Sequence, residues 1–491
     1  MLRKMILTIF LGGISLLFYM PQSEAAESRI DGKNRFEVAV NVSKNGWSRS
    51  NTVIVTNYLA YADALSASPL AYKKDAPILL TQNNHITPIT KNEINRLNAK
   101  EAVIIGGTGS ISNHAENELK SMGLSVTRID GKDRFVVAQN IAMQLSNKGK
   151  AVIAYGLNFP DALAIAPFAA RNEYPILLSS NDSLPSATKN ALKDKNITST
   201  YIIGGEASVS NSVKNQLPSP IRIGGANRFE VAENVIRQLN LTTQTAFLSS
   251  GLDFADALTG SVLAAKKNAP LLLTIPARLP NETKSIIQDK TIRTFTILGG
   301  PASVNNNSTA LLGKTIVLDP GHGDHDAGAS ANGLKEKDIV LDVGLRTRSK
   351  MINAGAKIIM TRSDDTFLAL TARSTIANNS GADSFISIHS NAAESPAAHG
   401  SEVYYDTTFS GPESKRLAEE IQKELVKRLG TSDRGEKEAN FHVIDKTRIP
   451  SILVELGFIT NPSDASKLGS PTYRQKSADA IYYGTVNFYT K

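Results

Sequence analysis

The chain has 491 residues, of which 41% are hydrophobic and 20% charged, and it contains no cysteine. This length predicts about three or four domains, and the composition is typical of a globular protein rather than a disordered one. The absence of cysteine excludes disulfide bonds, thiolate zinc sites and cysteine nucleophiles. Any metal site must therefore use histidine and carboxylate ligands.

Positive charge is concentrated in the front of the chain. Residues 1–313 carry 32 Lys and Arg against 23 Asp and Glu, whereas residues 314–491 carry 22 against 23. A basic surface attracts polyanions such as nucleic acids, acidic polysaccharides and anionic membranes. General solubility explains the excess equally well, and the export signal described next argues against a nucleic-acid partner.

The N-terminus has the three parts of an export signal. Arg3 and Lys4 precede an apolar run over residues 5–20, and residues 23–25 (Ser-Glu-Ala) have the small residues of a cleavage site. This order predicts a secretory signal peptide over residues 1–25. A retained signal anchor is the alternative, but the run is short for a membrane span. We expect a secreted protein with no membrane anchor after cleavage.

One pattern occurs three times between residues 29 and 308. Each unit begins with Arg-Ile-x-Gly-x-x-Arg-Phe, at Arg29, Arg128 and Arg222, and ends in a Gly-Gly pair. Within each unit, β-branched runs alternate with amphipathic helical stretches, which predicts βαβ units and a parallel sheet. Units of roughly 95 residues are long enough to be small domains with their own cores, packed with pseudo-threefold symmetry.

For the repeated residues a structural role is favoured, and polymer binding is the leading functional alternative. The repeated Asp63, Asp161 and Asp256 are expected in the first turns of helices, and the Gly-Gly pairs in tight turns after strands. No histidine and no paired carboxylates recur in all three units, which argues against catalysis there. Guanidinium groups match anionic groups in bidentate fashion. The candidate polymer-binding residues are therefore Arg29, Arg35, Arg128, Arg134, Arg222 and Arg228.

The triple motif resembles the type-2 cell-wall-binding repeat family of Gram-positive surface proteins. The resemblance implies non-covalent anchoring to anionic polymers threaded through peptidoglycan. We expect repeats at residues 27–121, 122–216 and 217–308, a short polar linker at 309–313, and a separate catalytic domain at 314–491.

The last third of the chain holds three apolar strand-like runs that end in a possible metal ligand or base. These ends are His322, His389 and Glu455, and Glu336 opens an amphipathic helix that stops at Gly355. In open α/β sheets, ligands collect outside the carboxyl ends of the strands. His322, Glu336 and His389 would be an adequate set of three protein ligands for catalytic zinc, with water in the fourth place. Glu455 would take the proton from that water and pass it to the leaving amine.

Other assignments fit the sequence less well. His325 is the nearest rival ligand but lies in an expected loop, and His399 and His442 have no matching geometric argument. Taken alone, each site residue has a structural explanation, such as a salt bridge for Glu455. Neither a His-Glu-x-x-His helix nor a Gly-x-Ser-x-Gly elbow is present, which disfavours the common zinc-peptidase and serine-hydrolase arrangements.

Several segments occur in a characteristic order: Asp319-Pro-Gly-His-Gly, Glu336-Lys-Asp, Ser387-Ile-His-Ser-Asn391 and Val454-Glu-Leu-Gly-Phe-Ile-Thr-Asn461. Over residues 314–489 they resemble the zinc-dependent N-acetylmuramoyl-L-alanine amidase family (amidase type 3). The resemblance implies an open α/β fold with a mostly parallel, twisted sheet. The chain departs from the family pattern at Asp324, where a glycine is usual.

The same resemblance assigns roles to particular residues. It implies zinc ligation by His322, Glu336 and His389 and catalysis by Glu455. The candidate substrate-binding residues are Asn391 and Asn461, which end two of these motifs, and Arg373, which with Ala377-Asn378 forms a further motif of the same ordered set. The reaction implied is hydrolysis of the amide between N-acetylmuramic acid and L-alanine of the stem peptide.

The sequence therefore predicts a secreted, cell-wall-associated autolysin of Gram-positive type. Zinc would be its cofactor, peptidoglycan its substrate and an anionic wall polymer its anchor. Two alternatives stay open: a zinc peptidase acting within the stem peptide, and a non-enzymatic wall-bound surface protein.

Overall fold

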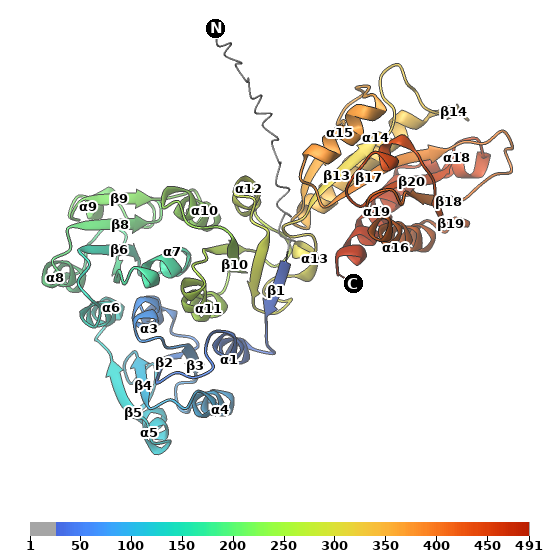
Figure 1. Ribbon diagram of the computed structural model, residues 1–491. Helices are drawn as coiled ribbons and strands as arrows, with labels where there is room; N and C mark the ends of the chain where they lie inside the picture. The colour runs from blue at the N-terminus through green and yellow to red at the C-terminus, as the bar shows by residue number, and fades with distance from the viewer. Residues whose placement is uncertain (1–25, 491) are drawn as a thin grey trace, which may run out of the picture.

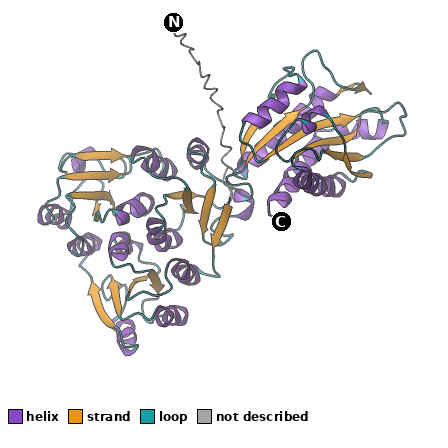
Figure 2. Ribbon diagram, viewed as in Figure 1, coloured by secondary structure: helices purple, strands orange, loops and turns teal. Residues whose placement is uncertain are grey.

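The computed structural model describes residues 26–490, so the predicted signal peptide lies outside the described residues. The described chain forms two parts, which Figure 1 and Figure 2 show side by side. The front part has three four-stranded sheets, and the C-terminal part has one six-stranded sheet. The α/β class, the tandem repeat domains and the C-terminal open sheet are thus confirmed. Within the described range, every helix is too short or too polar to cross a membrane.

All pairs of neighbouring strands in the three small sheets are parallel, as the alternating pattern predicts. The strand orders are β3-β2-β4-β5, β7-β6-β8-β9 and β11-β10-β12-β1. The central strands are continuous apolar runs because helices bury them on both faces. The strands are β1 (Ala26–Ile30), β2 (Thr52–Asn57), β3 (Ile78–Thr81), β4 (Glu101–Ile105), β5 (Ser125–Ile129), β6 (Lys150–Tyr155), β7 (Ile176–Ser179), β8 (Ser199–Ile203), β9 (Pro220–Ile223), β10 (Thr245–Ser250), β11 (Leu271–Thr274) and β12 (Thr294–Leu298).

The three units meet through one helix from each. Helices α3, α7 and α11 pack against one another at the centre of the front part (Figure 1). There the hydroxyl groups of Ser68 and Ser261 lie 2.7 Å apart and are buried. The helices are α1 (Arg35–Gly46), α2 (Tyr61–Ala64), α3 (Ser68–Lys73), α4 (Pro88–Leu97), α5 (Asn113–Ser121), α6 (Arg134–Met143), α7 (Pro160–Arg171), α8 (Ser186–Asp194), α9 (Asn211–Lys214), α10 (Arg228–Gln238), α11 (Ala255–Lys266), α12 (Asn281–Asp289) and α13 (Asn306–Thr309).

The last strand of each small sheet comes from the opening motif of another repeat. β5 and β9, which open the second and third repeats, complete the first and second sheets. The third sheet is completed by β1, which pairs with β12 from Ala26↔Thr294 to Ile30↔Leu298. The sheets therefore cross the predicted repeat boundaries at residues 122 and 217, because each opening motif is itself a strand. By pairing with β12, β1 closes the three units into a ring.

The repeated aspartates and glycines lock a turn, as predicted. Asp63, Asp161 and Asp256 all lie in the first turns of helices. In the first unit, the Ser110 hydroxyl donates to the Asp63 carboxylate at 2.6 Å. Gly106 has a φ of +108°, and a Cβ built on it would lie 2.6 Å from the same carboxylate. Only glycine fits this turn, so the motif has a structural explanation.

The C-terminal sheet has the order β16-β13-β17-β20-β18-β19. Neighbouring strands are parallel except for β18 and β20, so β18 and β19 run opposite to the other four strands. Alternate residues of the strands face two apolar layers, one containing α14, α16 and α19 and the other α15 and α17. The elements are β13 (Thr315–Pro320), β14 (Ser330–Ala331), β15 (Leu334–Lys335), α14 (Glu336–Asn353), β16 (Lys357–Met360), α15 (Leu370–Asn379), β17 (Ser384–Asn391), β18 (Ser401–Tyr405), α16 (Gly411–Leu429), β19 (Asp433–Glu438), α17 (His442–Asp445), β20 (Ser451–Phe458), α18 (Pro462–Leu468) and α19 (Pro471–Thr490).

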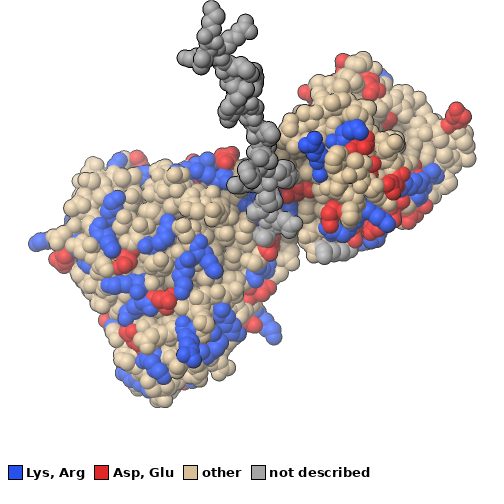
Figure 3. All heavy atoms as spheres, viewed as in Figure 1, with Lys and Arg blue, Asp and Glu red and all other residues tan. Residues whose placement is uncertain are grey.

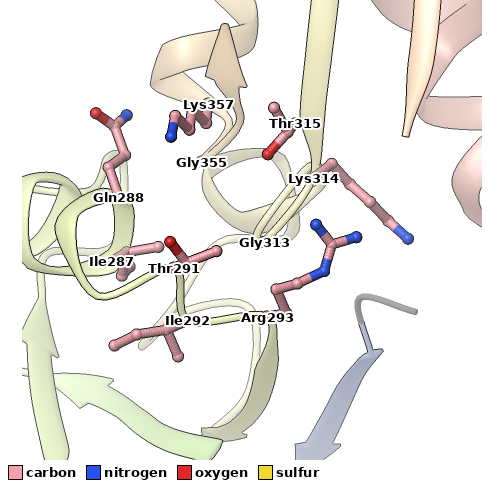
Figure 4. Close-up of a pocket in the computed structure, with 10 residues that line it drawn as sticks. All are labelled: Ile287, Gln288, Thr291, Ile292, Arg293, Gly313, Lys314, Thr315, Gly355 and Lys357. Carbon is pink, nitrogen blue, oxygen red and sulfur yellow. The ribbon is translucent and has the colours of Figure 1, made fainter. Parts of the chain in front are cut away.

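The two parts are packed together at the predicted linker, 309–313. Leu311 lies in the core of the C-terminal domain, and Leu312 lies in the core of the third repeat. The guanidinium of Arg293 pairs with the carboxylate of Asp383 across the junction. Figure 4 shows the pocket at this junction, which residues of both parts line. The connection is therefore short and buried at the two leucines, rather than a polar tether.

Because β1 closes the ring, removing β1 should affect its neighbour β12. A protein that begins at Asp31 lacks β1, so the amides of β12 that bond to β1 lose their acceptors. We expect those amides to exchange hydrogen at least about tenfold faster, since an open edge strand frays at low cost. Hydrogen exchange followed by mass spectrometry measures this effect, with the equivalent strands β4 and β8 as internal controls. Unchanged protection of β12 would contradict closure by β1.

Candidate metal centre and catalytic site

The carboxyl ends of β13, β17 and β20 lie at one edge of the C-terminal sheet (Figure 1). His322 follows β13, His389 lies near the end of β17, and Glu336 is the first residue of α14. The three side chains meet at this edge. Glu336 Oε1 lies 3.1 Å from His322 Nε2 and 3.0 Å from His389 Nδ1. One ligand atom from each residue lies within 4.8 Å of the other two. The structure thus gathers the three predicted ligands.

The donor set and its spacing fit zinc. Two imidazoles and one carboxylate are ligands that zinc takes in catalytic sites, with bonds of ~2.0–2.2 Å. Tetrahedral bonds of that length place neighbouring ligand atoms about 3.3 Å apart, close to the two distances above. These three residues can therefore hold a metal ion and leave one side open.

The backbone around His322 is shaped by two glycines. His322 has a φ of +61°, in the left-handed region that histidine rarely adopts. A Cβ on Gly321 would lie 2.2 Å from the His389 ring, and a Cβ on Gly323 would lie 2.1 Å from the Thr366 carbonyl oxygen. Glycine at both positions lets the loop press against its neighbours, which fixes where His322 points.

A two-residue hairpin places Glu336. Asn332 and Gly333 connect β14 to β15, and both have positive φ, as a type I′ turn requires. The Asn332 side-chain amide donates to the carbonyl of Ile459 at 2.9 Å, which ties the hairpin to the end of β20. β15 runs directly into α14, so the hairpin fixes the position of the Glu336 carboxylate.

Hydrogen bonds from outside the ligand set orient the ligands. Asp326 Oδ2 lies 2.8 Å from His322 Nδ1, which leaves Nε2 facing Glu336. The amides of Ala329 and Ser390 donate to the two oxygens of Glu336 at 2.9 Å each. Such partners fix the ring orientation of metal-binding histidines. The sequence reasoning missed Asp326, because an aspartate in a glycine-rich loop is ordinary turn chemistry.

These contacts also set the charges of the ligands. Burial works to lower the pKa of His322, but the carboxylates of Glu336 and Asp326 outweigh it, so the pKa is raised. Burial works to raise the pKa of Glu336, but the two imidazoles outweigh it and hold that pKa far below its usual range. Glu336 is therefore ionised, as a metal ligand must be.

Glu455 lies in the row of residues beside the ligands. It is paired in register with His389 on one side and with Glu402 of β18 on the other. Burial, together with the charges of Glu336 and Glu402, raises the pKa of Glu455 well above its usual value. Its Oε2 atom is buried and has no hydrogen-bond partner among the described residues. A buried carboxylate oxygen left without a protein partner is suited to bind water or substrate.

The site opens into a cavity of about 330 Å³. His322 and His389 form part of its wall, and Phe367, Leu370 and Val443 add an apolar part. A mostly apolar cavity with a few convergent polar groups is typical of a small-molecule or peptide site.

The predicted substrate-binding residues have different surroundings. Arg373 is almost fully buried and donates to Asp319 Oδ1 and the His322 carbonyl, at 2.7 Å each. Asn461 caps α18, and its amide donates to the Pro396 carbonyl at 2.7 Å. These bonds favour positioning roles for both residues over direct contact with substrate. Asn391 is two residues after His389, and its amide donates to Glu402 beside the centre.

The rival histidines lie outside the cluster. The His325 ring is exposed and packs on Phe367, with the ring centres 4.4 Å apart. His399 Nδ1 contacts the carbonyl of Ala397, and His442 lies at the start of α17. None of the three belongs to the group of possible metal ligands found among residues 26–490.

The six repeat arginines bind backbone carbonyls. Arg29, Arg128 and Arg222 donate to the carbonyls of Gly299, Gly106 and Gly204 at 2.9, 2.8 and 3.0 Å. Arg35, Arg134 and Arg228 donate to the carbonyls of Tyr58, Gly156 and Gly251. Each arginine therefore has a structural role at the end of a strand, and polymer contact by these residues stays a prediction.

Comparisons with known proteins match both parts of the chain. A family model described as N-acetylmuramoyl-L-alanine amidase matches residues 316–487, and one described as cell wall binding domain 2 matches residues 29–116, 128–214 and 222–309. The N-acetylmuramoyl-L-alanine amidase LytC of Bacillus subtilis is 44% identical over 493 residues, 99% of each chain. The amidase enhancer of Bacillus subtilis is 40% identical over 60% of this chain and 41% of its own length. The solved structure of Cwp6 from Clostridium difficile covers 100% of this chain and 83% of that chain, with 30% identity and a TM-score of 0.55.

The contact between Asp326 and His322 predicts weaker metal binding when it is removed. We expect Asp326→Asn to weaken Zn²⁺ affinity about 10–100-fold, because the imidazole loses the carboxylate that orients it and raises its basicity. Competition with a chromogenic chelator measures the affinity. Asp324→Asn is the matched control, because the Asp324 carboxylate contacts the exposed His325 and not His322. Equal affinity of the Asp326 variant and the wild type would contradict this role.

Proposed function

This chain belongs to the N-acetylmuramoyl-L-alanine amidase family and carries three cell wall binding repeats, and from this premise we propose its reaction and its place of action. We propose that it is a secreted, zinc-dependent enzyme that cleaves the amide between N-acetylmuramic acid and L-alanine of peptidoglycan. The convergence of His322, Glu336 and His389 beside Glu455 carries this proposal.

His322, Glu336 and His389 would hold the zinc ion. When bound there, zinc supplies Lewis-acid chemistry: it polarises the scissile carbonyl and makes water acidic enough to act as a nucleophile. Asp326 keeps the His322 ring in its ligating orientation, and the Ser390 and Ala329 amides hold Glu336 in place. His322 and His389 line the cavity, which would receive the substrate.

Glu455 would move the proton. Its buried Oε2 has no other partner among the described residues and sits one strand from His389. The carboxylate would accept a proton from the attacking water. It would then donate that proton to the nitrogen of L-alanine, which leaves as a free amine. One carboxylate thus serves both steps, so no second acid is required.

The repeats would hold the enzyme at the wall. Lys and Arg side chains gather on the visible face of the front part, whereas both signs alternate on the C-terminal part (Figure 3). This distribution agrees with the excess of positive charge in residues 1–313. We propose that this surface binds an anionic wall polymer, and that export requires the N-terminal residues 1–25.

Replacement of Glu455 should stop catalysis without unfolding the site. We expect Glu455→Gln to lower the rate of wall hydrolysis by a factor of about 10²–10⁴, because the proton shuttle is lost while the shape is kept. The assay is loss of turbidity of purified walls, with zinc content measured in the same preparation. Hydrolysis at the wild-type rate with full zinc content would show that Glu455 is not the base.

Mass spectrometry of the wild-type digest identifies the bond that is cut. An amidase releases intact stem peptides that begin with a free L-alanine amine. Peptides cleaved at an internal bond would instead favour the zinc-peptidase alternative, which the same ligands could support.

Binding to the wall should depend on charge. We expect the mature Glu455→Gln protein to bind intact walls. It should dissociate from them as the salt concentration rises, because salt screens attraction between exposed charges. Binding should fall about tenfold or more on walls chemically stripped of anionic polymer. Sedimentation of the protein with the walls measures both effects. Equal binding to stripped and intact walls would contradict anchoring to an anionic polymer.

A further inference from the structure

A second charged group lies beside Glu455. Glu402 of β18 is paired in register with Glu455, and only 2% of its side chain is exposed. Its Oε1 accepts from the Asn391 amide at 2.6 Å and from the Tyr404 hydroxyl at 2.8 Å. Its Oε2 accepts from Arg434 Nε at 2.8 Å and from Lys437 Nζ. Four donors occupy all the acceptor positions of this carboxylate.

A β-bulge brings both cations to one carboxylate. In a regular strand, residues three apart point to opposite faces of the sheet. Between Ser401↔Asp433 and Val403↔Glu436, however, β19 has one residue more than β18. Gly435, at the bulge, has a φ of +76°. The extra residue turns Arg434 and Lys437 to the same face, and bulges of this kind re-aim side chains next to active sites.

Arg434 and Lys437 together carry one more positive charge than the Glu402 carboxylate can balance. Two cations share a single carboxylate, and their side chains keep 35% and 39% of their surface exposed. Arg434 binds Glu402 through Nε alone and lies over the Phe458 ring, 4.8 Å from its centre. Neither of its terminal amino groups makes a hydrogen bond to a described residue. The two-pronged end of the guanidinium is therefore open to an anion, for which its geometry is well suited.

We propose that Arg434 and Lys437 form a carboxylate-binding subsite for the stem peptide. This inference rests on the proposed function and adds a preference of that same site. The polysaccharide backbone of peptidoglycan has no charge of its own, whereas the stem peptide carries carboxylates, so the subsite fits the peptide side of the scissile amide. Asn391, predicted to bind substrate, helps to position the subsite through Glu402.

Strand spacing indicates which carboxylate can reach the subsite. The charged ends of Arg434 and Lys437 contact Glu402 of β18, which is one strand from β20 in the sheet order, or about 5 Å at ~4.8 Å per strand. An extended peptide spans about 3.3–3.6 Å per residue. The carboxylate bound there is then one or two residues from the scissile amide. An isoglutamate at the second position of the stem peptide has a free α-carboxylate in this range, and its amidated form, isoglutamine, does not.

The test compares these two substrates. Synthetic N-acetylmuramoyl tripeptides with isoglutamate or isoglutamine at the second position are digested, and kcat/KM is measured by chromatography of the released peptide. We expect the wild type to prefer isoglutamate by about 10–100-fold, the range for a hydrogen bond to a charged group. Arg434→Lys keeps a cation beside Glu402 but loses the two-pronged end, so the preference should fall toward unity.

Two further variants separate the subsite from a structural effect. Lys437→Gln should also reduce the preference, whereas Lys427→Gln, which alters an exposed lysine on α16 paired with Glu424, should leave it unchanged. Equal use of both substrates by the wild type would overturn the subsite. So would an equal loss on both substrates in Arg434→Lys, since this pattern indicates a purely structural ion pair. Cleavage of neither substrate by the wild type would instead overturn the proposed function.

Discussion

The catalytic centre depends on a buried ion pair between Arg373 and Asp319. Their side chains are 2% and 0% exposed, and the guanidinium also donates to the carbonyls of Pro320 and His322. Removing one partner of such a pair typically costs ~3–5 kcal/mol, because the other charge is left buried and alone. The hydrogen bond from Arg373 to the His322 carbonyl helps to hold His322 in a left-handed conformation that histidine otherwise avoids. The first candidate ligand is thus fixed by residues of β13 and α15 that lie outside the candidate ligand set.

Glu336 connects the other two candidate ligands. One of its oxygens faces both histidines, and its backbone position is set by the hairpin that Asn332 ties to the end of β20. The three ligands come from segments far apart in the sequence, so no single local element could build the centre. Packing of the sheet, the hairpin and the His322 loop brings them together beside the cavity that His322 and His389 line.

The front part of the molecule is built in a different way, from three repeated units. Its three units repeat the same strands, caps and turns, and the opening strand of each unit completes another unit's sheet. The arginines and aspartates that recur most clearly are occupied in holding strand ends and turns. The recurring arginines and aspartates therefore mainly reflect the architecture of the ring. The excess of positive charge, spread over the surface, is the feature that points to a polyanionic partner.

The sequence by itself determined the fold class, the three repeats and the choice of the three candidate ligands and the candidate base. Each of these follows from local pattern: the alternation of strands and helices, motif recurrence, and polar residues at strand ends. Only the tertiary structure decided that β1 closes the ring, that Arg373 is buried, and that Asp326 orients His322. It also decided that Arg434 and Lys437 share one face, since a bulge breaks the two-residue period from which facing is predicted. These features depend on contacts between distant segments, and local periodicity carries no information about such contacts.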